Sequence, residues 1–183
     1  MTFDGVSVDY GSGAVCSGVS FTVEAGDRVA LRGGNGSGKS SLIKLLLGAD
    51  IPHTGEVKVG GGLKISYVPQ DASGLSGDLS EYASACGIDE SLFKAILRKL
   101  DFSRVQFEKD MRDFSEGQKK KVLIARSLCE EAHLHIWDEP LNYVDVISRI
   151  QIEELLTKFE PTLLFVEHDK AFCDNVATKT VEL

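Results

Sequence analysis

The stretch that decides the fold reads Gly33-Gly34-Asn35-Gly36-Ser37-Gly38-Lys39-Ser40. It matches the pattern G-x-x-x-x-G-K-[ST] and lies between a strand-like segment that ends near Leu31 and an apolar, helix-like run after Lys39. Glycines let a backbone wrap closely around phosphate groups, and successive backbone N–H groups and the helix N-terminus point at the anion. Lys39 can neutralise phosphate oxygens, and the Ser40 hydroxyl can bind Mg²⁺. The stretch therefore predicts a phosphate-binding loop at the start of a parallel α/β unit.

This loop and the serine after it form the predicted nucleotide-binding segment. The residues expected to bind are Gly33, Gly34, Asn35, Gly36, Ser37, Gly38, Lys39, Ser40 and Ser41. A chance turn with the same four fixed positions would occur in on the order of one chain in a hundred. By itself the loop indicates only a nucleotide phosphate, and it leaves kinases, GTPases and ATPases open.

The flanking segments indicate a mostly parallel sheet between helices. The first thirty residues alternate apolar and polar positions in three short runs, which predicts three strands. Glycines at 60–62 within the β-rich segment 56–68 predict a hairpin. Further along the chain, the spacing predicts helices at 78–100, 116–131 and 146–159 and buried strands at 134–137 and 162–166.

Length and composition bound the class of protein. With 183 residues, 43% of them hydrophobic and 26% charged, the chain suits one globular domain with its own core. Its apolar runs have strand length and it opens with no signal-peptide pattern, so we expect a cytoplasmic protein without a membrane span of its own. Four scattered cysteines predict reduced thiols. The net charge of −8 argues against nucleic-acid binding over the whole surface and leaves a local RNA contact open.

Two carboxylates follow an apolar strand. Asp138 and Glu139 should emerge at the carboxyl end of the sheet, where open α/β folds bind ligands. Asp138 can hold Mg²⁺ through water, and Glu139 can polarise an attacking water, a task that typically contributes roughly 10² to 10⁴ in rate. His168 ends the next apolar strand, from which it can reach a γ-phosphate. His133 and His135 lie at the opposite end of their strand and are interpreted as structural.

The run Phe114-Ser115-Glu116-Gly117-Gln118 opens a helix and resembles the L-S-G-G-Q signature of ATP-binding cassette (ABC) ATPases. Seven motifs of that family occur here in order, so the resemblance covers the whole chain, 1–183, as one cassette. It implies the ABC cassette fold of P-loop NTPases, which has an α/β core with a mostly parallel sheet, an antiparallel β-layer and a small helical subdomain. By this resemblance the helical subdomain is inserted at about residues 71–131. ATP and Mg²⁺ are the implied cofactors.

The resemblance also implies roles for individual residues. Tyr10 matches the aromatic residue that stacks on adenine, and Gln70 matches the glutamine that contacts Mg²⁺ and couples the nucleotide to the helical subdomain. The implied catalytic residues are Glu139, His168 and Gln70. The implied Mg²⁺ ligands are Ser40, Gln70 and Asp138.

In the family, two cassettes enclose two ATP molecules head to tail, and the signature of one closes over the phosphates held by the other. The residues that match this shared contact are Ser115, Gly117, Gln118 and Asp145. Hydrolysis of ATP to ADP and phosphate is therefore expected to need a second cassette, on the same longer chain or in a homodimer. Phe114 is a mild apolar departure from the signature. Glu116 replaces its first glycine and can weaken the closed dimer by like charge, so we expect its side chain to turn outward.

The run 138–145, D-E-P-L-N-Y-V-D, is similar to the D-E-P-T-N-H-L-D of ABC-F proteins, whereas transporter cassettes commonly carry S-A-L-D. ABC-F proteins carry two cassettes and act on ribosomes. The motif sequences of this chain look closest to those of the branch that confers resistance to lincosamides, pleuromutilins and streptogramin A. With no inserted arm and no long charged linker, the chain resembles the C-terminal cassette. The lysines at 119–121 could touch rRNA, although a solvated helix face is the favoured interpretation.

Two other functions stay open at this point. One is the ATP-binding subunit of a membrane transporter, against which Asn142 counts. The other is a regulatory nucleotide switch with little turnover, motivated by Glu116.

Overall fold

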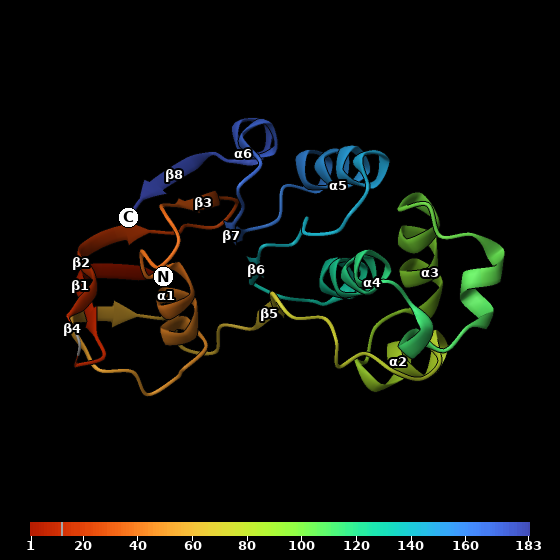
Figure 1. The fold of residues 1–183 in the computed structure, drawn as a ribbon, viewed down its shortest axis with the longest axis horizontal. Helices are drawn as coiled ribbons and strands as arrows, with labels where there is room; N and C mark the ends of the chain where they lie inside the picture. The colour runs from red at the N-terminus through yellow and green to blue at the C-terminus, as the bar shows by residue number, and fades with distance from the viewer. Residues whose placement is uncertain (12) are drawn as a thin grey trace.

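The computed structural model describes residues 1–11 and 13–183; three strands open the chain, and helices separate the later strands or groups of strands (Figure 1). The strands are β1 (Thr2–Asp9), β2 (Ala14–Thr22), β3 (Arg28–Arg32), β4 (His53–Lys58), β5 (Ile65–Val68), β6 (Leu134–Asp138), β7 (Leu163–Val166) and β8 (Lys179–Glu182). The helices are α1 (Lys39–Leu46), α2 (Leu79–Ala85), α3 (Glu90–Lys99), α4 (Glu116–Cys129), α5 (Val146–Phe159) and α6 (Lys170–Val176), with 3₁₀ turns at Arg104–Glu108 and Met111–Asp113.

Five strands form a parallel sheet in the order β5-β6-β7-β3-β8. Strands β6 and β7 are buried along their whole length, as expected for central strands with both faces covered. The predicted strands at 134–137 and 162–166 and the mostly parallel core sheet are confirmed. Because the strands run in one direction, their carboxyl ends lie along one edge of the sheet.

Alternate residues of these strands pack on opposite faces of the sheet. Ile136 and Leu164 belong to a cluster that includes α1 and the antiparallel strands. Trp137 and Phe165 belong to a second cluster with α4, α5 and α6. Trp137 is fully buried, and its indole N–H donates to the Ser127 hydroxyl at 2.9 Å. The sheet is therefore covered by α1 and the antiparallel layer on one face and by three helices on the other (Figure 1).

The antiparallel layer consists of three strands in the order β2-β1-β4. Phe3 lies opposite Phe21 across β1 and β2, and their rings stack with centroids 4.7 Å apart. The three strands predicted in the first thirty residues are confirmed, and so is the antiparallel layer. The third of those strands, β3, belongs to the parallel sheet instead.

The predicted hairpin over 56–68 is wrong. Strand β4 pairs with β1 in the antiparallel layer, whereas β5 pairs with β6 in the parallel sheet. A Cβ at Gly55 would lie 2.5 Å from the carbonyl oxygen of Gly5, so a glycine allows the close pairing of β4 with β1. The glycines at 60–62 therefore lead from one sheet to the other. Turn residues indicate where the chain changes direction, but they do not determine which strand receives the next segment.

Helices α2, α3 and α4 enclose a third cluster, which includes Phe93 and Val122. Asp78 and Asp89 accept backbone N–H groups at the starts of α2 and α3, which explains where these helices begin. The helical region predicted by spacing is thus present. Its delimitation as a subdomain at about residues 71–131 stays a prediction.

The longest helices, α4 and α5, have 14 residues each. A helix needs about 20 apolar residues to cross a bilayer. Among residues 1–11 and 13–183, no helix combines that length with that apolar character.

The two histidines at the start of β6 make contacts within the protein. His135 is buried, with its Nδ1 atom 3.1 Å from the Ser127 hydroxyl, and burial lowers the pKa of His135 to about 4. The backbone N–H of Lys64 donates to Nδ1 of His133 at 2.9 Å. His135 thus connects β6 to α4 in the core, and His133 contacts the segment before β5 at the surface, in keeping with a structural role for both rings.

The buried His135 predicts a specific sensitivity to acid. Its pKa is about 4 in the folded chain and about 6.5 in an unfolded one, so between these values only the unfolded chain takes up the proton. Stability is therefore lost as the pH falls below about 6.5. Lowering the pH from 7 to 5 should remove about 2 kcal/mol of unfolding free energy through this residue, and His135→Gln should abolish that share. Urea unfolding of both chains at the two pH values measures it, and equal losses would contradict the prediction.

Candidate nucleotide-binding site

The glycine-rich loop joins β3 to α1. Gly38 is the N-cap of α1 with φ 95°, and a Cβ there would lie 2.9 Å from the Cβ of Cys16. Gly33 has φ 152°, and a Cβ there would lie 2.5 Å from Ser37 Oγ and 2.9 Å from the carbonyl oxygen of Leu183. Both positions require glycine for space as well as for backbone angle. The loop leads directly into the amino end of α1, whose unpaired N–H groups can bind an anion.

Lys39 is the first residue of α1, and its side chain turns back over the loop. Its ammonium group donates to the carbonyl oxygens of Gly33 and Gly34, each at 2.8 Å, and the side chain is buried. Ser40 is exposed next to it, as are Asn35 and Gly36 at the tip of the loop. The loop thus combines a buried positive charge with an accessible hydroxyl.

Tyr10 lies beside the amino end of α1. Its hydroxyl is 3.0 Å from Ser41 Oγ, and 51% of the residue is exposed. A ring held at its edge next to the loop, with its faces open, can stack on a base. The structure thus brings Tyr10 and Ser41 to the loop; the stacking role itself stays a prediction.

Asp138 ends β6 and is buried. Its Oδ1 atom has no hydrogen-bond partner within the described residues. Burial and the neighbouring Glu139 raise the pKa of Asp138, and the cations of Lys120, Lys39 and Lys44 oppose that shift. A buried carboxylate oxygen without a donor is suited to a cation.

Glu139 follows in a left-handed backbone conformation, φ 48°, and its carboxylate is held by several side chains. One oxygen accepts hydrogen bonds from Gln70 Nε2 and Asn142 Nδ2, both at 2.7 Å. The other lies 3.4 Å from His168 Nε2. Burial alone would raise the pKa of Glu139, but these hydrogen bonds and the nearby His168 bring it below its usual value. The three residues predicted to be catalytic, Glu139, Gln70 and His168, therefore meet at one point.

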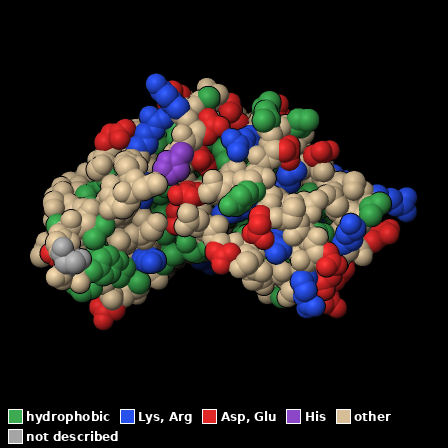
Figure 2. All heavy atoms as spheres, viewed as in Figure 1, with side chains coloured by type: hydrophobic (Ala, Val, Ile, Leu, Met, Phe, Trp, Pro, Cys, Tyr) green, Lys and Arg blue, Asp and Glu red, His purple; other side chains and the backbone are tan. Residues whose placement is uncertain are grey.

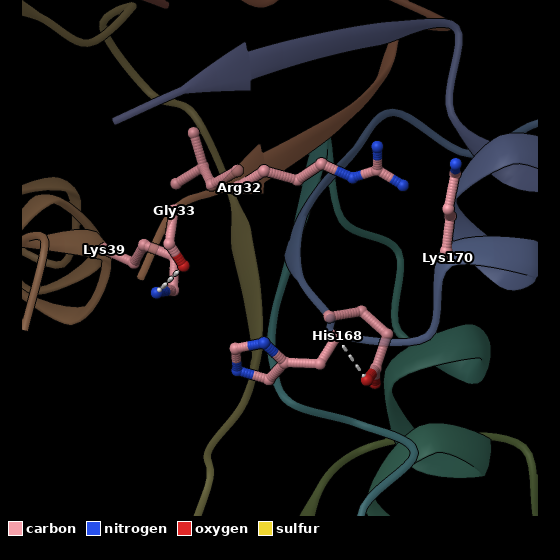
Figure 3. A pocket seen from close by; sticks show the side chains of 7 residues that line it. Arg32, Gly33, Lys39, His168 and Lys170 are labelled. Atoms are coloured by element: carbon pink, nitrogen blue, oxygen red, sulfur yellow. Dashed lines mark hydrogen bonds between the residues drawn. The ribbon is translucent and has the colours of Figure 1, made fainter. Parts of the chain in front are cut away.

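A pocket of about 220 Å³ lies between the loop and the end of β7 (Figure 3). His168 extends toward the side formed by Gly33 and Lys39, and Arg32 and Lys170 line the pocket farther from the loop. In Figure 2 a histidine and acidic side chains lie together on this face of the molecule. Four nitrogen-bearing side chains thus surround a space that can hold phosphate.

The sequence patterns did not identify every residue that lines this pocket. Glu167 is buried; one of its oxygens accepts the N–H of Leu141 at 3.1 Å and the other accepts the N–H of His168 at 2.7 Å. Arg32 and Lys170 were also missed, although each stands directly beside a motif that was identified. The signal that could have identified them is a charged residue close to a motif.

Ser115 and Gln118 of the signature cap α4 reciprocally. The Ser115 hydroxyl accepts the N–H of Gln118 at 3.3 Å, and the Gln118 side-chain oxygen accepts the N–H of Ser115 at 2.9 Å. Figure 1 shows α4 and α1 on opposite sides of β5 and β6. The signature therefore lies away from the phosphate-binding loop of its own chain.

Gly117 packs directly against the turn that follows β6. A Cβ at this position would lie 2.2 Å from the carbonyl oxygen of Tyr143. Asp145, which ends that turn, accepts from Ser148 as the N-cap of α5 and pairs with Lys121 at 2.6 Å. These contacts together lower the pKa of Asp145 well below its usual range despite some burial. The start of α4 and this turn thus form one rigid contact.

The lysines at 119–121 are neither solvated nor free to contact RNA, so both interpretations offered for them are wrong. All three are buried, with exposures between 2% and 8%. Lys119 pairs with the exposed Glu116 at 3.3 Å, Lys121 pairs with Asp145, and Lys120 donates to backbone carbonyls. Helix α4 is covered by the sheet on one side and the helical region on the other, which leaves little of its surface to solvent.

A parallel sheet that carries a glycine-rich loop after one strand and paired carboxylates after another defines a P-loop nucleotide-binding fold. The family model described as ABC transporter matches residues 16–142. The chain therefore belongs to the ABC transporter family, as an ATP-binding ATPase cassette.

Known proteins resemble the chain over nearly its whole length. It is 32% identical over 188 residues to the ATP-binding protein Uup of Caulobacter vibrioides, which covers 98% of this chain and 31% of Uup. It is 31% identical over 175 residues to the ribosome protection protein VmlR of Bacillus subtilis, which covers 92% of this chain and 31% of VmlR. The solved structure of an ATP-binding subunit of an ABC transporter aligns with a TM-score of 0.80 and 25% identity, over 100% of this chain and 85% of that one. The chain thus spans about a third of the length of these curated relatives.

The contact of Gly117 with Tyr143 predicts an inverted response to alanine. In a helix, Gly→Ala ordinarily stabilises by about 1 kcal/mol, but here the methyl group would overlap a carbonyl oxygen. Gly117→Ala should therefore lower the unfolding free energy by about 1–3 kcal/mol. Gly74→Ala is the control, because nothing lies within 4 Å of a Cβ there. Denaturant unfolding compares the two, and stabilisation by Gly117→Ala would show that the contact is not tight.

Proposed function

We propose that this chain binds ATP with Mg²⁺ and hydrolyses it to ADP and phosphate once a second cassette completes the site. The observation that carries the proposal is the carboxylate of Glu139, which Gln70, Asn142 and His168 hold beside the buried Asp138. Although burial raises the pKa of Glu139, the hydrogen bonds from Gln70 and Asn142 lower it on balance and so favour the ionised form. An ionised, immobilised carboxylate can accept a hydrogen bond from a water and orient it for attack on a phosphoryl group.

The residues present fit Mg²⁺. Asp138 offers a buried oxygen without a donor among the described residues, and oxygen atoms are the ligands that Mg²⁺ prefers. We propose Asp138, Ser40 and Gln70 as the protein groups that hold the ion, with Asp138 acting through water. Gln70 donates to Glu139 through its nitrogen, which leaves its oxygen for the metal. When bound, the ion would neutralise phosphate charge.

The nucleotide itself would lie along the loop. Lys39 is placed to neutralise phosphate oxygens, and the loop N–H groups from Gly33 to Ser41 would surround the phosphates. Tyr10 would stack on the adenine. His168 would contact the terminal phosphate from the opposite wall of the pocket in Figure 3.

A second cassette is part of this proposal because one chain keeps its signature away from its own loop (Figure 1). The surface that would close over the partner's nucleotide includes Ser115, Gly117, Gln118 and Asp145. Glu116 is exposed and paired with Lys119, an arrangement that leaves Ser115 accessible. The helical subdomain, at about residues 71–131, would carry the signature into that contact.

We further propose that the chain is the C-terminal cassette of a cytoplasmic ABC-F ATPase that protects the ribosome against antibiotics. Asn142 occupies the position at which the ABC-F motif differs from the transporter motif, and its side chain donates directly to Glu139. This sequence difference thus corresponds to a contact in the site. The likeness to VmlR, a ribosome protection protein, supports the same role.

The alternative is the ATP-binding subunit of a membrane transporter. The likeness to such a subunit in fold, at a TM-score of 0.80, favours it. A transporter cassette would bind an integral membrane partner, whereas an ABC-F cassette would bind the ribosome.

Replacement of Glu139 tests the catalytic proposal. Glu139→Gln should reduce steady-state ATP turnover by roughly 10²- to 10⁴-fold, while ATP binding persists because the loop and Lys39 are unchanged. The variant should also sediment as a closed dimer with Mg-ATP and as a monomer without it. Glu108→Gln, at an exposed residue of a 3₁₀ turn, is the matched control. Turnover that survives in Glu139→Gln would remove Glu139 from the reaction, and a wild-type chain that forms the closed dimer with Mg-ATP but shows no turnover would support the regulatory switch.

The ribosomal role has its own test. The protein that contains this cassette, carrying Glu139→Gln to prevent hydrolysis, should pellet with 70S ribosomes through a sucrose cushion in Mg-ATP and stay in the supernatant in Mg-ADP. The Glu108→Gln protein should associate only transiently under the same conditions. Failure to pellet with ribosomes, together with co-purification of an integral membrane protein, would favour the transporter subunit.

A further inference from the structure

Lys120 is the most deeply buried of the three consecutive lysines in α4, at 2% exposure. Its ammonium group donates to the carbonyl oxygen of Pro69 at 2.8 Å and to that of Glu139 at 3.2 Å. Both acceptors belong to the backbone, and they come from turns about seventy residues apart in the sequence. One side chain of α4 thus bonds to two turns that lie far apart in the sequence.

The two turns are those that present Gln70 and Glu139. Pro69 directly precedes Gln70, and Gln70 in turn donates to the Glu139 carboxylate at 2.7 Å. Glu139 has φ 48°, a left-handed conformation that is uncommon for a residue other than glycine. Lys120 is bonded to the carbonyl of that same residue, so it is placed to maintain the unusual backbone angle.

The neighbouring lysines do not share this arrangement. Lys119 pairs with Glu116 and Lys121 with Asp145, and both of these partners are surface carboxylates. Burial lowers the pKa of Lys120, and the negative charges of Asp138 and Glu139 oppose that shift without cancelling it. Of the three, Lys120 alone donates to the backbone of both turns that carry proposed catalytic side chains.

We propose that Lys120 is a positioning residue for ATP hydrolysis, which acts by tying the Pro69–Gln70 turn and the Glu139 turn to the signature helix α4. The inference rests on the proposed function for its effect on turnover. Its effect on the two turns does not depend on turnover. Because α4 also carries Ser115 at its amino end, this bond connects the helix of the signature to the backbone of Glu139.

The test compares Lys120→Met, Lys120→Arg and Lys119→Met with the wild-type chain. Methionine keeps most of the apolar stem and removes the donor, and arginine keeps a charged donor. Hydrogen–deuterium exchange without nucleotide should be at least about tenfold faster at 69–72 and 139–144 in Lys120→Met, with 39–46 unchanged. Lys120→Arg should restore part of the protection, and Lys119→Met, which removes an ammonium group bonded to neither turn, should show wild-type exchange in both segments.

Turnover supplies the second measurement. Displacement of a catalytic group by about 1 Å can lower a rate by roughly 10²-fold, so kcat should fall by about that factor in Lys120→Met while the KM for ATP is unchanged. Exchange and kcat equal to those of the wild-type protein would overturn the proposal, as would exchange that increases evenly along the chain. If the wild-type protein shows no turnover even with a second cassette present, the proposed function fails, and the exchange pattern still decides whether Lys120 positions the two turns.

Discussion

The shared direction of the strands in the central sheet is the constraint on which the site depends. The register pairs Leu31 with Val166 and Asp138 with Val166, so β3, β6 and β7 end at the same level. The glycine loop, the Glu139 turn and His168 therefore start from adjacent points. Strand β5 extends the same edge, because its last residue, Val68, pairs with Trp137. Four hydrogen-bonded strands thus bring together residues that lie far apart in the sequence.

Local chemistry was sufficient to predict most of the site. The glycine loop, Asp138, Glu139 and His168 were identified because each follows an apolar strand or opens a helix, whereas Gln70 was identified through the resemblance to the ABC family. What failed depended on contacts between distant segments. The glycines at 60–62 gave no information about which sheet takes up β5. The lysines at 119–121 were expected at a surface, because a charged residue type does not reveal the two layers that cover α4.

Helix α4 connects the regions of the molecule. Its apolar side chains contribute to the core behind the sheet and to the helical cluster. Its amino end is fixed by the capping pair of Ser115 and Gln118, and Gly117 contacts the turn after β6. Buried ammonium groups then join the helix to that turn and to the turn before Gln70. Burying positive charge is unfavourable unless it is paired, so these lysines are compatible with the fold only while their acceptors stay in place.

Trp137 has a consequence of a different kind. It is the single tryptophan of the sequence, it is fully buried, and it directly precedes Asp138 in β6. Its indole N–H has a defined acceptor in Ser127. The ultraviolet emission of the protein above the tyrosine band therefore originates from one ring, next to the carboxylates of the site. The molecule carries an intrinsic fluorophore at the place where its chemistry is expected, without the need for any label.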